Sequence, residues 1–230
     1  TQIQIDIERG GFDLIAITDN GSGIHEEDLA LALDRHATSK LRNEDDLASI
    51  GTLGFRGEAL ASIGMVSELS ISSRTSGNEG RMITMKDGDK GDVKPVGLAE
   101  GTKIEVKGIF FNQPARLAFQ RRPATETSKI VDVTVSHAIS NPEVGFRLTS
   151  DERTILEVPA VEDMEDRLYD LLGGQAGKMI LLKSPPADLE APGDEKWTGW
   201  VSTPDITRGK GDDIHVLING RPVASQPFLQ

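Results

Sequence analysis

Two short glycine-containing stretches carry the side chains best suited to bind a charged ligand. The first, Gly54–Leu60 (G-F-R-G-E-A-L), runs directly into a small-residue helix that we expect to begin at Ala59. Glycine lets the backbone approach a ligand closely, and the amide groups at a helix start favour anions. Arg56 adds a planar guanidinium group that matches a phosphate. The alternative is a glycine-bounded turn that only caps the helix.

The second stretch, Asp19–Ile24 (D-N-G-S-G-I), follows the apolar run Leu14–Ile17. A carboxylate at the end of a strand could accept a hydrogen bond from an exocyclic amine. The neighbouring glycines would leave room for a flat base. An Asx-type turn that ends the strand is the alternative, and the sequence leaves both interpretations open.

Alternating apolar and polar residues, together with turn-forming residues, predict the strands, helices and turns around these stretches. Isoleucine alternates with polar residues over 3–7, and a turn at Arg9–Gly11 leads to a second strand at 14–17. Together these features predict an antiparallel hairpin whose second strand carries Asp19 at its end. Polar residues 38–51 predict a loop. Three acids at 26–28 favour a helix start. Further strands are expected at 69–72, 82–85 and 103–106, with a hairpin tip at 87–92.

A helix from about 124 to 139 should stop at Asn141-Pro142, because proline cannot continue a helix, and we place a domain boundary there. The second part should contain a helix at 162–172 that ends at Gly173-Gly174. Its strands are expected at 146–149, 154–158, 179–182, 197–202 and 214–218.

Composition limits the classes of protein that fit. A chain of 230 residues suffices for one large or two small domains. It has no cysteine, which excludes disulfides and thiolate metal sites, and no apolar run long enough for a membrane span. The four histidines lack metal-binding spacing. The first residues lack Met and signal-peptide features and open inside an alternating pattern, so we expect a fragment.

The net charge is −12, from 37 acidic and 25 basic residues. Nucleic-acid binding requires a local basic surface, so the excess of acid has two interpretations. The acidic residues could be spread over the solvated surface, for example as an adaptation to a salty cytoplasm, with the basic residues gathered on one face. Alternatively, this chain makes no contact with DNA.

Four motifs together resemble the ATP-binding motifs of the GHKL superfamily in order and spacing. They are D-N-G-S-G-I at 19–24, H-A-T-S-K at 36–40, G-F-R-G-E-A-L at 54–60 and G-T at 101–102. The residues of the third motif resemble those of the MutL family of DNA mismatch repair proteins. Two later motifs, F-N-Q-P-A-R at 111–116 and I-N-G-R at 218–221, are also similar to motifs of that family. The resemblance extends from about residue 3 to residue 225.

The resemblance implies an α+β fold with two domains. Residues 1–142 would form a GHKL-type (Bergerat) α/β sandwich that lacks its first helix motif. Residues 143–230 would form a small α+β transducer domain like domain 2 of ribosomal protein S5, incomplete at its C-terminus.

The resemblance also implies a nucleotide site. Asp19 would bind the adenine amino group, with Gly23 and Thr102 beside the base. The loop that begins at residue 38 would be a lid over the nucleotide. An ordinary surface loop is the alternative for that segment. Glu58 could instead be a structural acid at a helix start. The implied ATP-binding residues are Asp19, Gly21, Gly23, Thr38, Ser39, Lys40, Gly54, Phe55, Arg56, Gly57, Glu58, Ala59, Leu60 and Thr102.

No catalytic residue is assigned. In the family, the general-base Glu and the Mg²⁺-binding Asn lie in an E-x-x-x-N-x-x-D-A motif upstream of the first strand of this chain. We therefore expect ATP and Mg²⁺ as cofactors of a full-length ATPase, and no activity from this fragment alone. No metal site is expected within the chain.

Two groups of basic residues are candidates for DNA contact without sequence specificity. The first group is Arg116, Arg121 and Arg122, near Phe119, and the second is Arg208, Lys210 and Arg221. Solvated surface charge is the alternative for each.

By resemblance, the full protein would be an ATP-switched clamp that forms a homodimer or heterodimer. It would couple a MutS-type mismatch sensor to a downstream nuclease or helicase, in the cytoplasm or, in a eukaryote, the nucleus, without a membrane partner. The alternatives are another GHKL ATPase, such as a type II topoisomerase B subunit, or a non-hydrolysing module that binds DNA or a partner.

Overall fold

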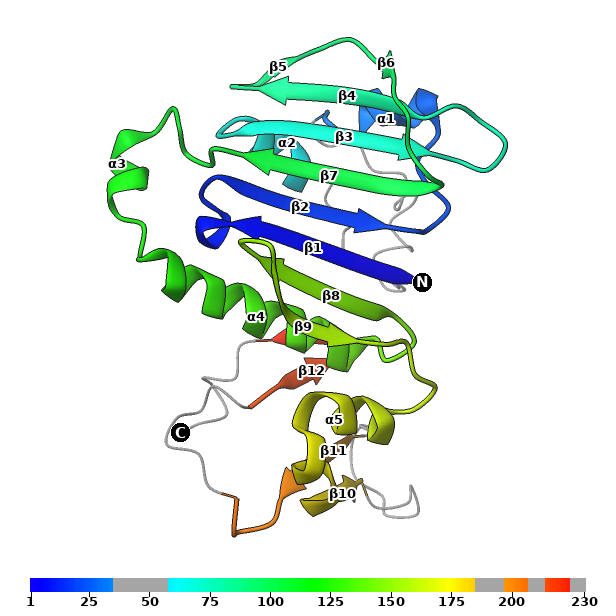
Figure 1. Cartoon of the computed structure of the whole chain (residues 1–230), viewed down its shortest axis with the longest axis vertical. Coiled ribbons are helices and arrows are strands. Elements are labelled where there is room, and N and C mark those ends of the chain that lie inside the picture. The colour runs from blue at the N-terminus through cyan, green and yellow to red at the C-terminus, as the bar shows by residue number, and fades with distance from the viewer. Residues whose placement is uncertain (35–57, 185–196, 207–213, 224–230) are drawn as a thin grey trace, which may run out of the picture.

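The computed structural model describes residues 1–34, 58–184, 197–206 and 214–223. Most of its strands form one mixed sheet in the order β5-β4-β3-β7-β2-β1-β8-β9, with β6 beside β4 (Figure 1). Its strands are β1 (Gln2–Glu8), β2 (Leu14–Asp19), β3 (Glu68–Arg74), β4 (Arg81–Lys86), β5 (Asp89–Lys90), β6 (Lys94–Pro95), β7 (Gly101–Lys107), β8 (Gly145–Ser150) and β9 (Arg153–Val158).

The predicted hairpin at the start of the chain is confirmed. Strands β1 and β2 pair antiparallel around the short helix η1 (Arg9–Gly11), with Ile5 opposite Ile17 and Ile3 opposite Asp19. Strand β2 also pairs antiparallel with β7, so β2 lies inside the sheet with a partner on each edge. Asp19 is therefore held at the end of a strand that is bonded on both sides.

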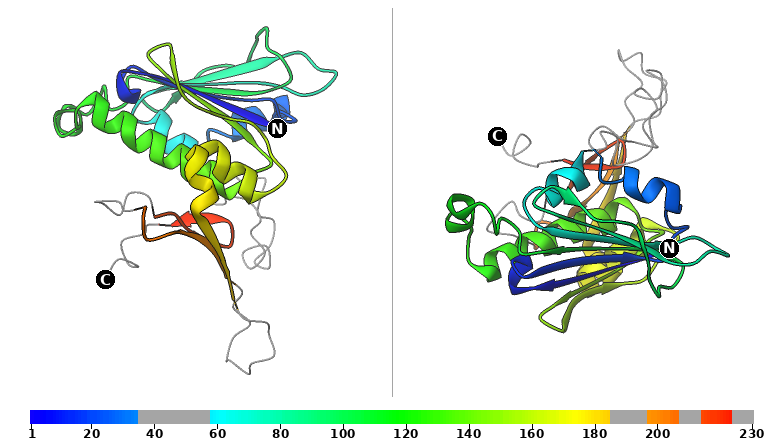
Figure 2. Two further views of the ribbon diagram at one scale, coloured as in Figure 1. Left: turned by 60° about the horizontal axis from the view of Figure 1, so that its bottom comes forward. Right: turned by 90° about the horizontal axis from the view of Figure 1, so that it is seen from above.

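The helices cover one face of the sheet. Figure 2 shows α1 (Glu26–Leu31), α2 (Ala59–Gly64) and α4 (Pro123–Ser140) on the same side of the strands. The core between α1, α2 and the sheet consists of Leu29, Leu33, Leu69, Ile71, Ile83, Met85 and Val106. On the strands, side chains alternate between faces, so Asp19 points to the same face as the apolar Ile15 and Ile17.

The sheet continues beyond α4. Strand β8 pairs in parallel with β1, residues 2–7 lying beside residues 145–150, and β9 pairs antiparallel with β8. A second, smaller core under α4 contains Ala138, Phe146 and Val158, and Ile3 packs against it. The predicted helix from about 124 to 139 is confirmed as α4. The domain division after residue 142 stays a prediction, and the sheet itself is continuous across that position.

The last third of the chain forms smaller units. Helix α5 (Met164–Leu172) is capped by Asp163, whose carboxylate accepts a hydrogen bond of 3.0 Å from the Asp166 amide, and it ends at Gly173 in a short 3₁₀ helix, η3 (Gly173–Lys178). Two-stranded sheets pair β10 (Met179–Lys183) with β11 (Thr198–Ser202) and β12 (Val216–Ile218) with β13 (Arg221–Val223). Among the described residues, no helix is long and apolar enough to cross a membrane.

Several details differ from the sequence prediction, among them the short strand β6. The expected hairpin tip at 87–92 is a tighter turn at Asp87 and Gly88, both with positive φ, after which Asp89–Lys90 already pair with β4. Helix α3 (Pro114–Ala118) was not predicted, because its five residues are all exposed and have no apolar periodicity. Strand β13 was not predicted either, since proline stands at its centre.

Candidate nucleotide-binding site

Asp19 forms the Asx turn that was one of the two interpretations of its motif. Its Oδ1 accepts a hydrogen bond of 2.8 Å from the Gly21 amide. Among the described residues, its second oxygen, Oδ2, accepts none. A carboxylate has acceptor capacity for several donors, so the turn fixes the side chain and still leaves one oxygen available for a ligand amine. The half-buried position of Asp19 favours such a contact.

Thr102 lies directly opposite Asp19 in the ladder between β2 and β7. The two residues were predicted to share the adenine end of a nucleotide, and the strand register brings them together. Thr102 is buried, at 8% exposure. The predicted pair is therefore adjacent in space although the residues lie far apart in sequence.

Ser73 connects Thr102 and Gly101 to the glycine loop, and it was not among the predicted site residues. Its hydroxyl donates to the Gly101 carbonyl at 3.0 Å and accepts from the Ile24 amide at 2.7 Å. Because its only proton is used, the Thr102 hydroxyl is the donor in the 3.0 Å contact between the two side chains. A usable signal existed, since Ser73 follows Leu69 and Ile71 on the buried face of β3.

Two glycines allow backbone segments to meet here. Gly23 has φ of 75° and Gly101 has φ of 126°. A Cβ on Gly23 would collide with the Arg74 carbonyl, and a Cβ on Gly101 would collide with the Asp19 carbonyl. These glycines therefore allow close approach between the loop and the strands. The expectation that the glycines of the Asp19–Ile24 loop leave room for a base stays a prediction.

Two cavities open near the ends of these strands. The first, of about 180 Å³, is lined by Gln2, Gln4, Thr18, Asp19, Asn20, Leu98, Ala99, Glu100, Gly101 and Thr102. Gln4 and Thr18 pair with each other on the face opposite to the Asp19 side chain, so this cavity belongs to the polar side of the sheet. It is not the side on which the helices lie (Figure 2).

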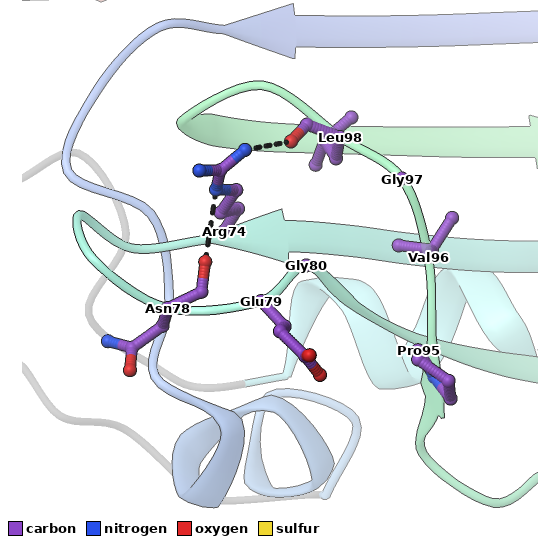
Figure 3. Close-up of a pocket in the computed structure, with 8 residues that line it drawn as sticks. All are labelled: Arg74, Asn78, Glu79, Gly80, Pro95, Val96, Gly97 and Leu98. Atoms are coloured by element: carbon purple, nitrogen blue, oxygen red, sulfur yellow. Dashed lines mark hydrogen bonds between the residues drawn. The ribbon is translucent and has the colours of Figure 1, made fainter.

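The second cavity, of about 500 Å³, contains none of the predicted site residues (Figure 3). Arg74 spans one side of it and donates to the carbonyls of Asn78 and Leu98, each at 3.0 Å. These hydrogen bonds connect the loop after β3 to the segment before β7, so the guanidinium group of Arg74 has a structural role here.

The second glycine stretch is only partly described. Glu58 is the N-cap residue of α2, and Ala59 and Leu60 form its first turn. The helix start predicted at Ala59 is thus confirmed. The other predicted ligands Thr38, Ser39, Lys40, Gly54, Phe55, Arg56 and Gly57 lie outside the described residues.

The candidate DNA contacts fall on separate elements. Arg116 lies on the exposed helix α3, with its guanidinium carbon 5.6 Å from the centre of the Phe110 ring. Arg221 begins β13 and is half-buried after a turn at Asn219 and Gly220. Arg208 and Lys210 lie outside the described residues. Within the described ranges, no group of three or more metal-ligating side chains occurs.

Sequence comparisons find known proteins that are similar to this chain. The family of histidine kinase-, DNA gyrase B- and HSP90-like ATPases matches residues 1–99. DNA mismatch repair protein MutL of Geobacter sulfurreducens is 41% identical over 221 residues, covering 96% of this chain and 36% of that protein. MutL of Streptococcus equi subsp. equi is 40% identical over 96% of this chain and 33% of its own length. The chain spans about a third of the length of these curated relatives.

Solved structures give the same result for the fold. The Aquifex aeolicus MutL ATPase domain complexed with ADP superimposes with a TM-score of 0.72 and 27% identity, covering 99% of this chain and 77% of that domain. The N-terminal domain of a DNA repair protein, at 23% identity and a TM-score of 0.75, supports the fold alone. This chain therefore belongs to the MutL family of DNA mismatch repair proteins and corresponds to its GHKL ATPase domain region.

Proposed function

We propose that this chain binds ATP on the helix-covered face of the sheet, between the Asp19–Ile24 loop and the start of α2. The observation that carries the proposal is the adjacency of Asp19 and Thr102 across β2 and β7, with Ser73 bonding Thr102 to the Ile24 amide of the glycine loop. The similar MutL ATPase domain complexed with ADP supports it.

Each group has a defined task in this proposal. Oδ2 of Asp19 accepts a hydrogen bond from the adenine amino group, and Thr102 and Gly23 lie beside the base. The backbone amides of 54–60 bind the polyphosphate, with Arg56 as an additional cation. Thr38, Ser39 and Lys40 contact the ribose or phosphates from the hinge of the lid.

Mg²⁺ accompanies ATP in this proposal and would neutralise phosphate charge. The described residues do not provide a group of ligands that could hold the ion. No step of the proposed binding therefore depends on a metal ligand from the described part of the chain.

The proposed architecture is a GHKL sandwich over 1–142 followed by a domain similar to domain 2 of ribosomal protein S5 over 143–230. The core under α1 and α2 lies wholly within 1–142, whereas the core under α4 combines Ile3 and Ala138 with Phe146 and Val158 across the proposed division. In the whole protein, ATP binding would pair two such regions into a clamp on DNA, and hydrolysis would reset it. A MutS-type sensor and a downstream nuclease or helicase are the proposed partners.

Sequence-independent DNA contact is proposed for α3 and its flanks. Residues 107–125 contain four basic residues and no acid, in a chain whose net charge is −12. Arg116, Arg121 and Arg122 are all exposed, beside Phe119, which is 87% exposed. This local basic surface favours the interpretation in which the acidic residues lie elsewhere on the protein. Arg221, Arg208 and Lys210 remain the second proposed group.

Calorimetry with a non-hydrolysable ATP analogue and Mg²⁺ on the full-length protein tests the nucleotide site. The proposal expects binding that Asp19→Ala abolishes. Asp13→Ala is a matched control, because Asp13 precedes the same strand and pairs with exposed Arg9 at 3.0 Å. Absence of heat at millimolar analogue, or equal binding by the Asp19 variant, would refute the proposal and favour a module that does not use nucleotide.

A further inference from the structure

Three consecutive carbonyls at the C-terminal end of α2 are bonded by segments distant in sequence. The Gly64 carbonyl accepts from the Gly88 amide at 3.2 Å, and the Val66 carbonyl accepts from the Phe110 amide at 2.6 Å. Between them, the Met65 carbonyl accepts from Nδ2 of Asn112 at 2.9 Å. The last carbonyls of a helix lack partners within the helix, so these bonds anchor its end.

Asn112 joins the two anchoring segments to each other. Its Nδ2 group also donates to the Asp87 carboxylate, in the turn that presents the Gly88 amide. One side-chain amide thus bonds both the helix end and the neighbouring turn. The backbone of Phe110, two residues before it, supplies the third bond.

The orientation of the Asn112 amide is fixed by its neighbours. Both partners of Nδ2 are acceptors, so rotating the amide by half a turn would place Oδ1 against two other oxygens. In the observed orientation, Oδ1 is buried and has no hydrogen-bond partner among the described residues. An unpaired buried acceptor is unfavourable, which means that the residue is used for its two donor protons.

Helix α2 depends on such anchors because it is short. Its six residues, Ala59–Gly64, span about 9 Å at the usual rise per residue, and isolated helices of this length are unstable in water. Leu60 and Ile63 pack against the core, and the three carbonyl bonds hold the opposite end from Glu58. A shift at the C-terminal end therefore moves the first turn.

We propose that Asn112 is a positioning residue for the nucleotide site: it holds α2 so that the first turn, Glu58–Leu60, meets the polyphosphate. The proposal rests on the function proposed above. It assigns Asn112 an effect on the phosphate end of the nucleotide only, because Asp19 and Thr102 at the base end belong to other elements.

The first test compares ADP and adenosine binding by the full-length protein and its Asn112→Ala variant. The variant should bind ADP about tenfold more weakly, the loss expected for one to two hydrogen bonds, and adenosine as tightly as the unsubstituted protein does. Asn78→Ala is the control, because Asn78 also donates from Nδ2 to a hydroxyl and a carbonyl but in a turn away from α2. It should change neither affinity.

The outcomes separate the two proposals. If the unsubstituted protein binds no ADP, the proposed function fails and this inference fails with it. If the protein binds ADP and the Asn112 variant binds it equally well, only the inference is overturned. The same conclusion follows if ADP and adenosine affinities fall by one common factor, because that result indicates a general loss of folded protein.

A second set of variants tests the link to Asp87. Asn112→Asp places a carboxylate against Asp87 and the Met65 carbonyl, so it should weaken ADP binding more than Asn112→Ala does. Adding Asp87→Asn restores a donor between the two positions and should recover part of the affinity. Absence of any recovery, with both variants folded by circular dichroism, would contradict the role of this contact.

Discussion

Asp19 and Thr102 are direct partners across the antiparallel ladder between β2 and β7, and Ser73 on β3 bonds the Thr102 hydroxyl at 3.0 Å. Three neighbouring strands thus contribute one polar residue each to the same end of the sheet. The Asx turn at Asp19 and the glycine loop are attached to this group, which makes it the fixed part of the proposed base-binding end.

Replacing Ser73 by Ala should reduce stability and weaken nucleotide binding. The change leaves the Ile24 amide without its partner and removes the bonds to Gly101 and Thr102, so we expect a loss of about 1–3 kcal/mol in the free energy of unfolding. Urea denaturation measures it. Ser70→Ala is the control, because Ser70 lies on the opposite face of β3 and, among the described residues, its hydroxyl has one contact, of 3.4 Å, with Glu105. Equal effects of both changes would contradict this role of Ser73.

The close approach at Gly23 can be separated from its backbone conformation. Gly23 and Gly77 have nearly the same φ, 75° and 74°, but only Gly23 lies against other backbone atoms. Gly77→Ala should therefore cost about 1–2 kcal/mol, for the left-handed conformation alone. Gly23→Ala should cost about 1–3 kcal/mol more, for the collision with the Arg74 carbonyl. Thermal unfolding of the two variants gives the difference, and equal losses would show that the contact is unimportant.

Arg167 on α5 should be a strong stability determinant. It is fully buried and donates to the carbonyls of Pro142 and Val144, both at 2.8 Å, where α4 is followed by β8. Burial lowers the pKa of its guanidinium group, and the nearby charges of Asp170 and Glu143 oppose that shift. We expect Arg167→Ala to cost about 3 kcal/mol, since two carbonyls lose a charged donor. Arg153→Ala, at an exposed position on β9, should change the unfolding free energy little.

DNA contact by α3 predicts a specific change in salt dependence. Arg116→Ala should weaken binding to any DNA sequence and reduce the slope of log affinity against log salt by about 1. Fluorescence anisotropy of a labelled duplex over several salt concentrations measures the slope. Arg153→Ala again serves as the control for loss of one exposed charge. An unchanged slope for Arg116→Ala would exclude a phosphate contact at this position.

Local patterns in the sequence were sufficient for the elements near the site. Alternating isoleucines predicted β1, and the apolar run and Asx motif predicted that β2 ends at Asp19. Asn141-Pro142 predicted the end of α4. In each case, the deciding preference acts within a few residues.

Contacts between distant segments could not be predicted in this way. The hydroxyl of Ser73 acquires its role from Ile24 and Gly101, and Asn112 acquires its role from Met65 and Asp87. Neither partner set has a spacing that a periodic pattern could detect. The exposed helix α3 was missed for a different reason, since nothing buries it and its sequence carries no apolar face.

The parallel pairing of β1 with β8 has a consequence for synthesis of the protein. Residues 2–7 pair on one edge with residues 145–150, which lie 143 positions further along the sequence, so this pairing waits until those residues have been made. Contacts of such long sequence separation form slowly, and an open strand edge can pair with another chain. During translation, this edge of β1 is therefore a point at which the fold is exposed to misassembly, and β8 is the strand that ends that exposure.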